Sequence, residues 1–154
     1  MSRNNLGKLT FGAGAVIAAL IATSAPAAAS NYTFDLPMTT TGAYGLGCSG
    51  DVWAVGSGST DSEIPGTVNL QLRGWLKVFG VPAPWCTLAP TVQWRNLDTG
   101  ATGWVSVDLR NVQPFFWSYP VIGNVRLVTG PGQVEFTLTT DLPHTPSVTT
   151  IQVY

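Results

Sequence analysis

Apolar and polar residues alternate along most of the chain after residue 30. Between residues 67 and 73, Val68, Leu70 and Leu72 occupy every second position, with polar residues between them. Successive side chains of a strand point to opposite faces, so this alternation predicts strands with one buried and one exposed face. Helical periodicity is not evident after residue 30. The same alternation predicts strands at residues 32–36, 51–56, 67–80, 91–97, 102–109, 121–129, 133–140 and 148–154.

Short strands separated by glycine and proline turns are typical of sandwiches and barrels. We therefore expect an all-β fold: one antiparallel β-sandwich, immunoglobulin-like, with seven or eight strands and one disulfide. Residues 98–101 predict a hairpin turn between the strands at 92–97 and 103–109, in which Trp94 and Trp104 could face each other.

The remaining connections follow from the turn residues. Gly130-Pro131-Gly132 predicts a second hairpin, between 125–128 and 134–138, and the stretch 39–50, rich in glycine and threonine, predicts a long loop. The expected core consists of alternating inward positions: Val68, Leu70, Leu72, Trp94, Val105, Val107, Val125, Leu127, Val134, Phe136, Leu138, Ile151 and Val153.

Residues 1–29 have the pattern of an export signal. Arg3 and Lys8 precede a charge-free apolar run of residues 11–22, and Ala27-Ala28-Ala29 fits a signal-peptidase site. The apolar run is shorter than the roughly 20 residues that a membrane-spanning helix needs. We expect residues 30–154 to form a single secreted, extracellular domain without a transmembrane helix.

Export makes the two cysteines interpretable. Cys48 and Cys86 form an even pair, and an oxidising compartment favours a disulfide between them. The sequence has one histidine and no second cysteine pair, so the residues do not suggest a metal site, and we expect no cofactor. The cysteines are too close together in sequence to be the usual inter-sheet bridge of an immunoglobulin domain.

The charge of the expected mature domain limits its partners. Residues 30–154 contain five basic and eight acidic residues, a net charge of −3 with His144 neutral. Binding to nucleic acid needs a basic face that displaces counterions from phosphates, so this partner class is excluded. The remaining candidates are a carbohydrate, a lipid or a protein outside the cell, and we expect a monomer.

Aromatic residues provide the strongest candidates for binding. Residues 114–120 hold Phe115, Phe116, Trp117 and Tyr119 between two prolines in a connection that does not alternate. Exposed rings on a rigid loop could bind a ligand, or the same rings could fold back and plug one end of the sandwich. Trp75 and Phe79 lie on the polar side of the 67–80 strand, which is therefore expected to be partly exposed, whereas Trp85 is expected to pack on the disulfide.

One turn suggests catalysis. Leu97-Asp98-Thr99-Gly100-Ala101 resembles the active-site turn of retroviral-type aspartic proteases, in which two aspartates share a proton. The strand before the turn is polar here, and Asp-Thr-Gly is also ordinary hairpin composition. His144 lies between prolines without a nucleophile elbow, so it does not suggest a serine triad.

The sequence therefore favours a secreted, non-enzymatic binding or envelope-associated module that uses exposed aromatic residues and has no catalytic residues. The alternatives are a hydrolase with Asp98 at its centre and an oligomeric or pore-forming envelope protein. Most expected strands are shorter than the roughly 9–11 residues of a membrane barrel strand.

Overall fold

The computed structural model describes residues 30–110 and 120–154, which form only strands, turns and loops. About 67% of the structure is strand, all strand pairs are antiparallel, and one disulfide is present. Eight strands have five or more residues: β1 (Asn31–Gly42), β2 (Cys48–Ser59), β3 (Thr67–Val78), β6 (Thr91–Asn96), β7 (Thr102–Ser106), β9 (Val121–Val128), β10 (Gly132–Thr139) and β11 (Ser147–Val153). Three more have two residues each: β4 (Val81–Pro82), β5 (Thr87–Leu88) and β8 (Leu109–Arg110).

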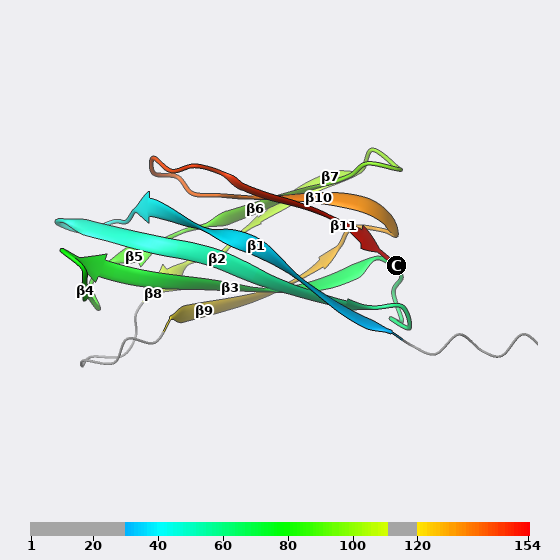
Figure 1. Ribbon diagram of the computed structural model, residues 1–154, viewed down its shortest axis with the longest axis horizontal. Helices are drawn as coiled ribbons and strands as arrows, with labels where there is room; N and C mark the ends of the chain where they lie inside the picture. The colour runs from blue at the N-terminus through cyan, green and yellow to red at the C-terminus, as the bar shows by residue number, and fades with distance from the viewer. Residues whose placement is uncertain (1–29, 111–119) are drawn as a thin grey trace, which may run out of the picture.

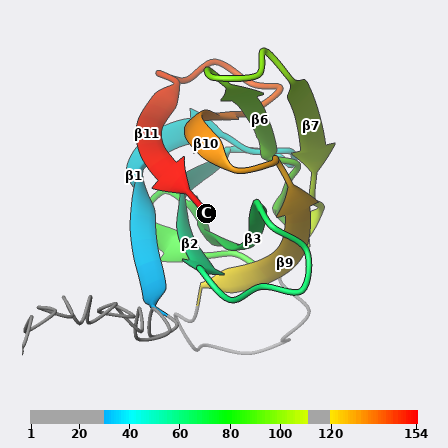
Figure 2. The same cartoon turned by 90° about the vertical axis from the view of Figure 1, so that its right-hand side faces the viewer.

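Two sheets face each other across the core, as Figures 1 and 2 show. The first has the order β1-β2-β3, and both β9 and β4 pair with β3. The second has the order β11-β10-β6-β7, and the short pair β5-β8 is separate from both. The outer faces of the two sheets therefore point in opposite directions.

The alternation of residue types correctly predicts the core. Eight of the thirteen expected residues are buried: Val68, Leu70, Leu72, Leu127, Val134, Phe136, Leu138 and Val153. The other five are partly buried and pack against them: Trp94, Val105, Val107, Val125 and Ile151. Aromatic rings also pack over glycines of the neighbouring strand, so that a Cβ at Gly56 would lie 2.2 Å from the Phe34 ring. This glycine therefore allows Phe34 to enter the core.

The prediction of a long loop over residues 39–50 is wrong, because strands occupy both ends of this stretch. β1 continues to Gly42, and β2 begins at Cys48. Thr39 and Thr41 are buried, and their hydroxyls bond to the Thr145 carbonyl and to the Thr140 hydroxyl, both at 2.7 Å. Threonine can face the interior here because the segment at 140–145 satisfies its hydroxyl.

Two expected strand contacts are also wrong. β9 pairs with β3 and β10 pairs with β6 and β11, so residues 129–131 cross between the sheets and do not close a hairpin. The hairpin of β6 and β7 does form, but its register places Trp94 opposite Gly103 and Trp104 opposite Gln93. The two indoles therefore lie on opposite faces of the sheet.

Candidate functional site

Two loops meet at the end of the molecule where β2 begins and β3 ends (Figure 1). The first loop precedes β2 and contains Tyr44 and Leu46, and the second follows β3 and contains Phe79 and Trp85. Backbone hydrogen bonds of 2.8 and 3.1 Å between Tyr44 and Thr87 join the two loops. Hydrogen bonds of this kind give both loops a defined position.

Five large apolar side chains on these loops are exposed. Leu46 is 95% exposed, Phe79 92% and Trp85 64%, and Val81 and Tyr44 are also exposed. The Phe79 ring lies beside Gly47, and the Trp85 ring lies beside Gly45. We call this surface the apolar tip and define it by these side chains: Tyr44, Leu46, Phe79, Val81 and Trp85. Large contiguous apolar surfaces on folded domains usually mark interaction sites.

The two segments that form the apolar tip contain no charged residues. Residues 43–50 and 78–90 contain no aspartate, glutamate, lysine, arginine or histidine. The hydroxyl of Tyr44, at its edge, donates a hydrogen bond to the Asp141 carboxylate. This hydrogen bond raises the pKa of the Tyr44 phenol above its ordinary value, so the ring stays neutral at physiological pH. The five side chains of the tip are therefore uncharged, and the Asp141 carboxylate lies at its edge beside Tyr44.

Phe79 has a backbone conformation that suits another residue better. Its φ is +47° and that of Gly80 is +85°, and the two residues join β3 to β4 because Val78 pairs directly with Val81. A two-residue turn with positive φ at both positions favours asparagine, aspartate or glycine, and a bulky residue there costs about 1–2 kcal/mol. An exposed phenylalanine in this place contributes little to the core, so core packing does not explain its presence.

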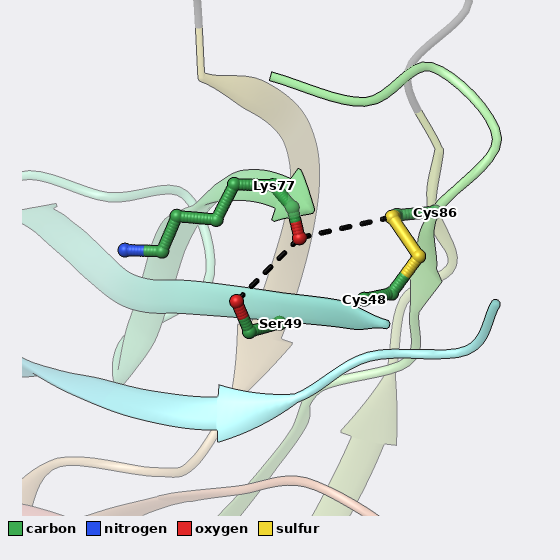
Figure 3. Close-up of a disulfide and its surroundings, with 4 residues drawn as sticks. All are labelled: Cys48, Ser49, Lys77 and Cys86. Atoms are coloured by element: carbon green, nitrogen blue, oxygen red, sulfur yellow. Dashed lines mark hydrogen bonds between the residues drawn. A yellow bond between two sulfur atoms is a disulfide. The ribbon is translucent and has the colours of Figure 1, made fainter. Parts of the chain in front are cut away.

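The disulfide holds the second loop against the first. Cys48 begins β2 and is bonded to Cys86, with 5.8 Å between the Cα atoms (Figure 3). The Cys86 sulfur lies 3.9 Å from the Lys77 carbonyl oxygen, a packing contact because a bridged sulfur carries no hydrogen. The predicted pairing is therefore confirmed. Trp85, which was expected to pack on the disulfide, is 64% exposed, and its ring and the Cys48 sulfur both lie beside Gly45.

An ion pair lies on β2 and β3 behind the apolar tip. The Lys77 Nζ is 2.5 Å from Asp51 Oδ2, and the Thr40 hydroxyl donates to Asp51 Oδ1 at 2.8 Å. Burial alone raises the pKa of the Asp51 carboxyl, but the hydrogen bonds from Lys77 and Thr40 and the charge of Lys77 outweigh it. The pKa is therefore below the ordinary value of 3.8.

We expect this ion pair to make stability depend on acidity. A carboxyl group with a depressed pKa stabilises the folded state above its ordinary pKa, and this stabilisation is lost as the pH falls through the folded value. Urea unfolding of wild type and Asp51→Asn should therefore differ more in free energy at pH 7 than at pH 3. An unchanged difference between these pH values would contradict the assignment.

Trp75 is the expected binding residue that the structure describes. It is half-exposed on the outer face of β3, and its ring makes an edge-to-face contact with Trp53 at a centroid distance of 5.2 Å. Phe79, expected to be partly exposed on the same side, is almost fully exposed. The other expected binding residues, Phe115, Phe116, Trp117 and Tyr119, lie outside the described residues.

The turn that resembles a protease motif has structural contacts. Asp98 Oδ2 accepts a hydrogen bond of 2.9 Å from the Gln133 amide, which ties the turn to the start of β10. Asn96 Oδ1 accepts from the Asp98 and Thr99 amides, both at 3.1 Å. These contacts give Asp98 a role in joining two segments of the fold.

His144 is likewise held within its own loop. Its Nε2 accepts from the Thr140 amide at 3.2 Å, and its Nδ1 lies 2.7 Å from the Leu142 carbonyl oxygen. Both ring nitrogens are therefore used to shape residues 140–144. The sequence could not predict these hydrogen bonds, because the residues next to a histidine do not indicate which groups its ring will contact.

The alternation of residue types could not predict that Leu46, Val81 and Trp85 are exposed at the tip. These residues lie in short loops between strands, where the period of two does not apply. The available signal was the absence of charge over residues 43–50 and 78–90, which is unusual for connections that run along a protein surface.

Comparison of the chain with protein-family models gave no match, and neither did comparison with curated proteins or with solved structures. In the part of the chain that the structure describes, no helix has the length and apolar character needed to cross a membrane. The geometry of the site is therefore the basis for a functional proposal.

Proposed function

We propose that this chain is an exported, non-enzymatic envelope-associated module that binds the surface of a neutral lipid bilayer through the apolar tip. The observation that carries the proposal is Phe79, which is 92% exposed at a turn position that disfavours it. A residue that costs stability in the free protein is explained if it contributes free energy when the tip enters an apolar phase.

The composition of the tip supports a lipid surface over a protein partner. A charged side chain is expensive in a bilayer, and the two loop segments contain none. Tyrosine and tryptophan favour the interfacial layer between water and hydrocarbon, and phenylalanine, leucine and valine favour the hydrocarbon. A typical protein–protein interface has an apolar core surrounded by a polar rim. Here, in contrast, both loop segments are free of charged residues.

The surrounding charges support a neutral lipid over an anionic one. Lys77, the cation closest in sequence to the second loop, is paired with Asp51. Residues 30–154 have a net charge of −3, which opposes approach to an anionic surface. The binding free energy is therefore expected to come from apolar burial and to depend little on salt.

We expect Phe79→Asn to weaken vesicle binding while keeping or raising stability. Removing a fully inserted phenylalanine costs about 1.5–3 kcal/mol of apolar transfer, so the partition coefficient should fall about tenfold or more. Asparagine suits the turn, so the midpoint of thermal unfolding should not decrease. The measurements are co-sedimentation with phosphatidylcholine vesicles and thermal unfolding.

Trp104→Ala is the matched control for this experiment, because Trp104 is also highly exposed but lies on the other sheet. It should sediment with vesicles as the wild type does. The proposal is wrong if wild type does not bind the vesicles, or if Phe79→Asn and Trp104→Ala weaken binding equally.

The proposal also includes an immunoglobulin-like arrangement of the two sheets and secretion of the protein. Two antiparallel sheets around one core support an immunoglobulin-like sandwich. The basic, apolar and small-residue pattern of residues 1–29 supports secretion, and the disulfide agrees with an oxidising compartment.

A further inference from the structure

The outer face of the second sheet carries a hollow of about 660 Å³. It crosses three neighbouring strands, β10, β6 and β7. The outward-facing side chains that line it include Gln93, Arg95, Thr102, Trp104, Glu135 and Thr137. The apolar tip is formed by other strands and loops, so this hollow is a separate surface.

The strand register arranges these residues in two adjacent rows. In the first, Gln93 lies between Thr137 of β10 and Trp104 of β7. In the second, Arg95 lies between Glu135 and Thr102. Neighbouring strands are roughly 5 Å apart, so each row spans about 10 Å across the sheet. This is the width of a small polar ligand or of one or two sugar rings.

Trp104 forms the wall of the hollow at the edge strand. It is 72% exposed and faces outward, whereas Trp94, on the neighbouring strand, turns inward against Gly103. The ring is therefore available to a ligand. A flat aromatic ring beside polar groups suits a ligand with one apolar face and many hydroxyls.

The polar groups provide both donors and acceptors. Arg95 donates, Glu135 accepts, and the amide of Gln93 and the hydroxyls of Thr102 and Thr137 do both. Among the residues that the structure describes, neither Arg95 nor Glu135 takes part in an ion pair. One cation and one anion leave the lining without net charge, which favours an uncharged ligand.

We propose that this hollow binds an uncharged glycan. Trp104 stacks on the C–H face of a sugar ring, Glu135 accepts hydrogen bonds from its hydroxyls, and Arg95 and Gln93 donate to its oxygens. A phosphate or carboxylate ligand would meet the negative charge of Glu135, and a lipid chain would desolvate the polar side chains of the lining without satisfying them. The chemistry of the lining therefore selects a neutral polyhydroxylated ligand.

Affinity electrophoresis and titration of tryptophan fluorescence test this site. The probes are soluble neutral oligosaccharides of glucose, mannose, xylose and N-acetylglucosamine, and heparin serves as a charged probe. We expect wild type to bind at least one neutral probe, and Trp104→Ala to weaken that binding at least tenfold. Glu135→Gln, which keeps the shape of the side chain, should weaken it by a smaller factor.

Trp75→Ala is the matched control, since Trp75 is an exposed tryptophan on the opposite sheet, and it should bind the probe as wild type does. Phe79→Asn should also keep glycan binding, which separates this site from the lipid surface. The inference is overturned if no neutral probe binds at millimolar concentration, if heparin binds better than every neutral probe, or if Trp75→Ala and Trp104→Ala are equally impaired.

Discussion

We expect Asn96→Ala to be strongly destabilising, with a loss of about 3–5 kcal/mol in the free energy of unfolding. Asn96 is completely buried. Its Nδ2 donates to the carbonyl oxygens of Thr129 at 3.1 Å and of Pro131 at 3.0 Å, with Gly130 at 3.3 Å. Its Oδ1 accepts from the two amides of the 98–101 turn.

The reason for so large an effect is that one side chain satisfies backbone groups of two segments. Residues 129–131 cross from one sheet to the other, and their carbonyl groups have no strand partner at this point. Alanine leaves the Thr129 and Pro131 carbonyls and the turn amides without this partner, whereas the Gly130 carbonyl still accepts from the Thr129 hydroxyl. The cost is largest at the Thr129 carbonyl, because a buried unsatisfied group costs about 1–3 kcal/mol.

Urea unfolding of Asn96→Ala measures this loss, and Thr99→Ala serves as its control. Thr99 lies in the same turn, but its hydroxyl accepts only an exposed hydrogen bond from Ala101. Its replacement should cost less than about 1 kcal/mol. If Asn96→Ala were as stable as Thr99→Ala, the role of Asn96 as the connection between the sheets would be refuted.

The second large effect is expected from removing both cysteines. The bridge between Cys48 and Cys86 spans a sequence separation of 38 residues, and the chain-entropy relation gives it about 3–4 kcal/mol. The double variant Cys48→Ala/Cys86→Ala should lose this amount in urea unfolding. Alanine is chosen because Cys86 is completely buried, and serine would place a hydroxyl there.

The same variant should bind phosphatidylcholine vesicles more weakly, because the bridge fixes the loop that carries Phe79 and Trp85. A flexible loop loses conformational entropy when it binds, whereas a fixed loop has already lost it. Wild type treated with a reducing agent should match the variant in both stability and binding. Stability and binding that are both unchanged on reduction would show that the disulfide does not hold the tip.

The sequence alone was sufficient for most of the longer strands, their inner faces and the disulfide, but it missed the end of β1 and the start of β2. Alternation in β3 and β10 identifies the buried positions because side chains in a strand alternate strictly between two faces. The cysteine pairing followed from there being only two cysteines. The exposure of Phe79 also followed from its place on the polar side of its strand.

The partners of the strands were decided only by the tertiary structure. Gly130-Pro131-Gly132 suits a hairpin, yet β9 pairs with β3, and Asn96 of β6 holds residues 129–131 where they cross between the sheets. Alternation reports which face of a strand is buried and carries no information about which strand lies beside it.

The two candidate sites depend on the same distinction. The apolar tip brings residues 44–46 next to residues 79–85, and the polar hollow brings Glu135 beside Arg95, across distances in sequence that no local pattern connects. Local sequence determined what each strand and loop could bury or expose. The folded sheets determined which of these surfaces came together, because strand pairing and core packing act over the whole chain at once.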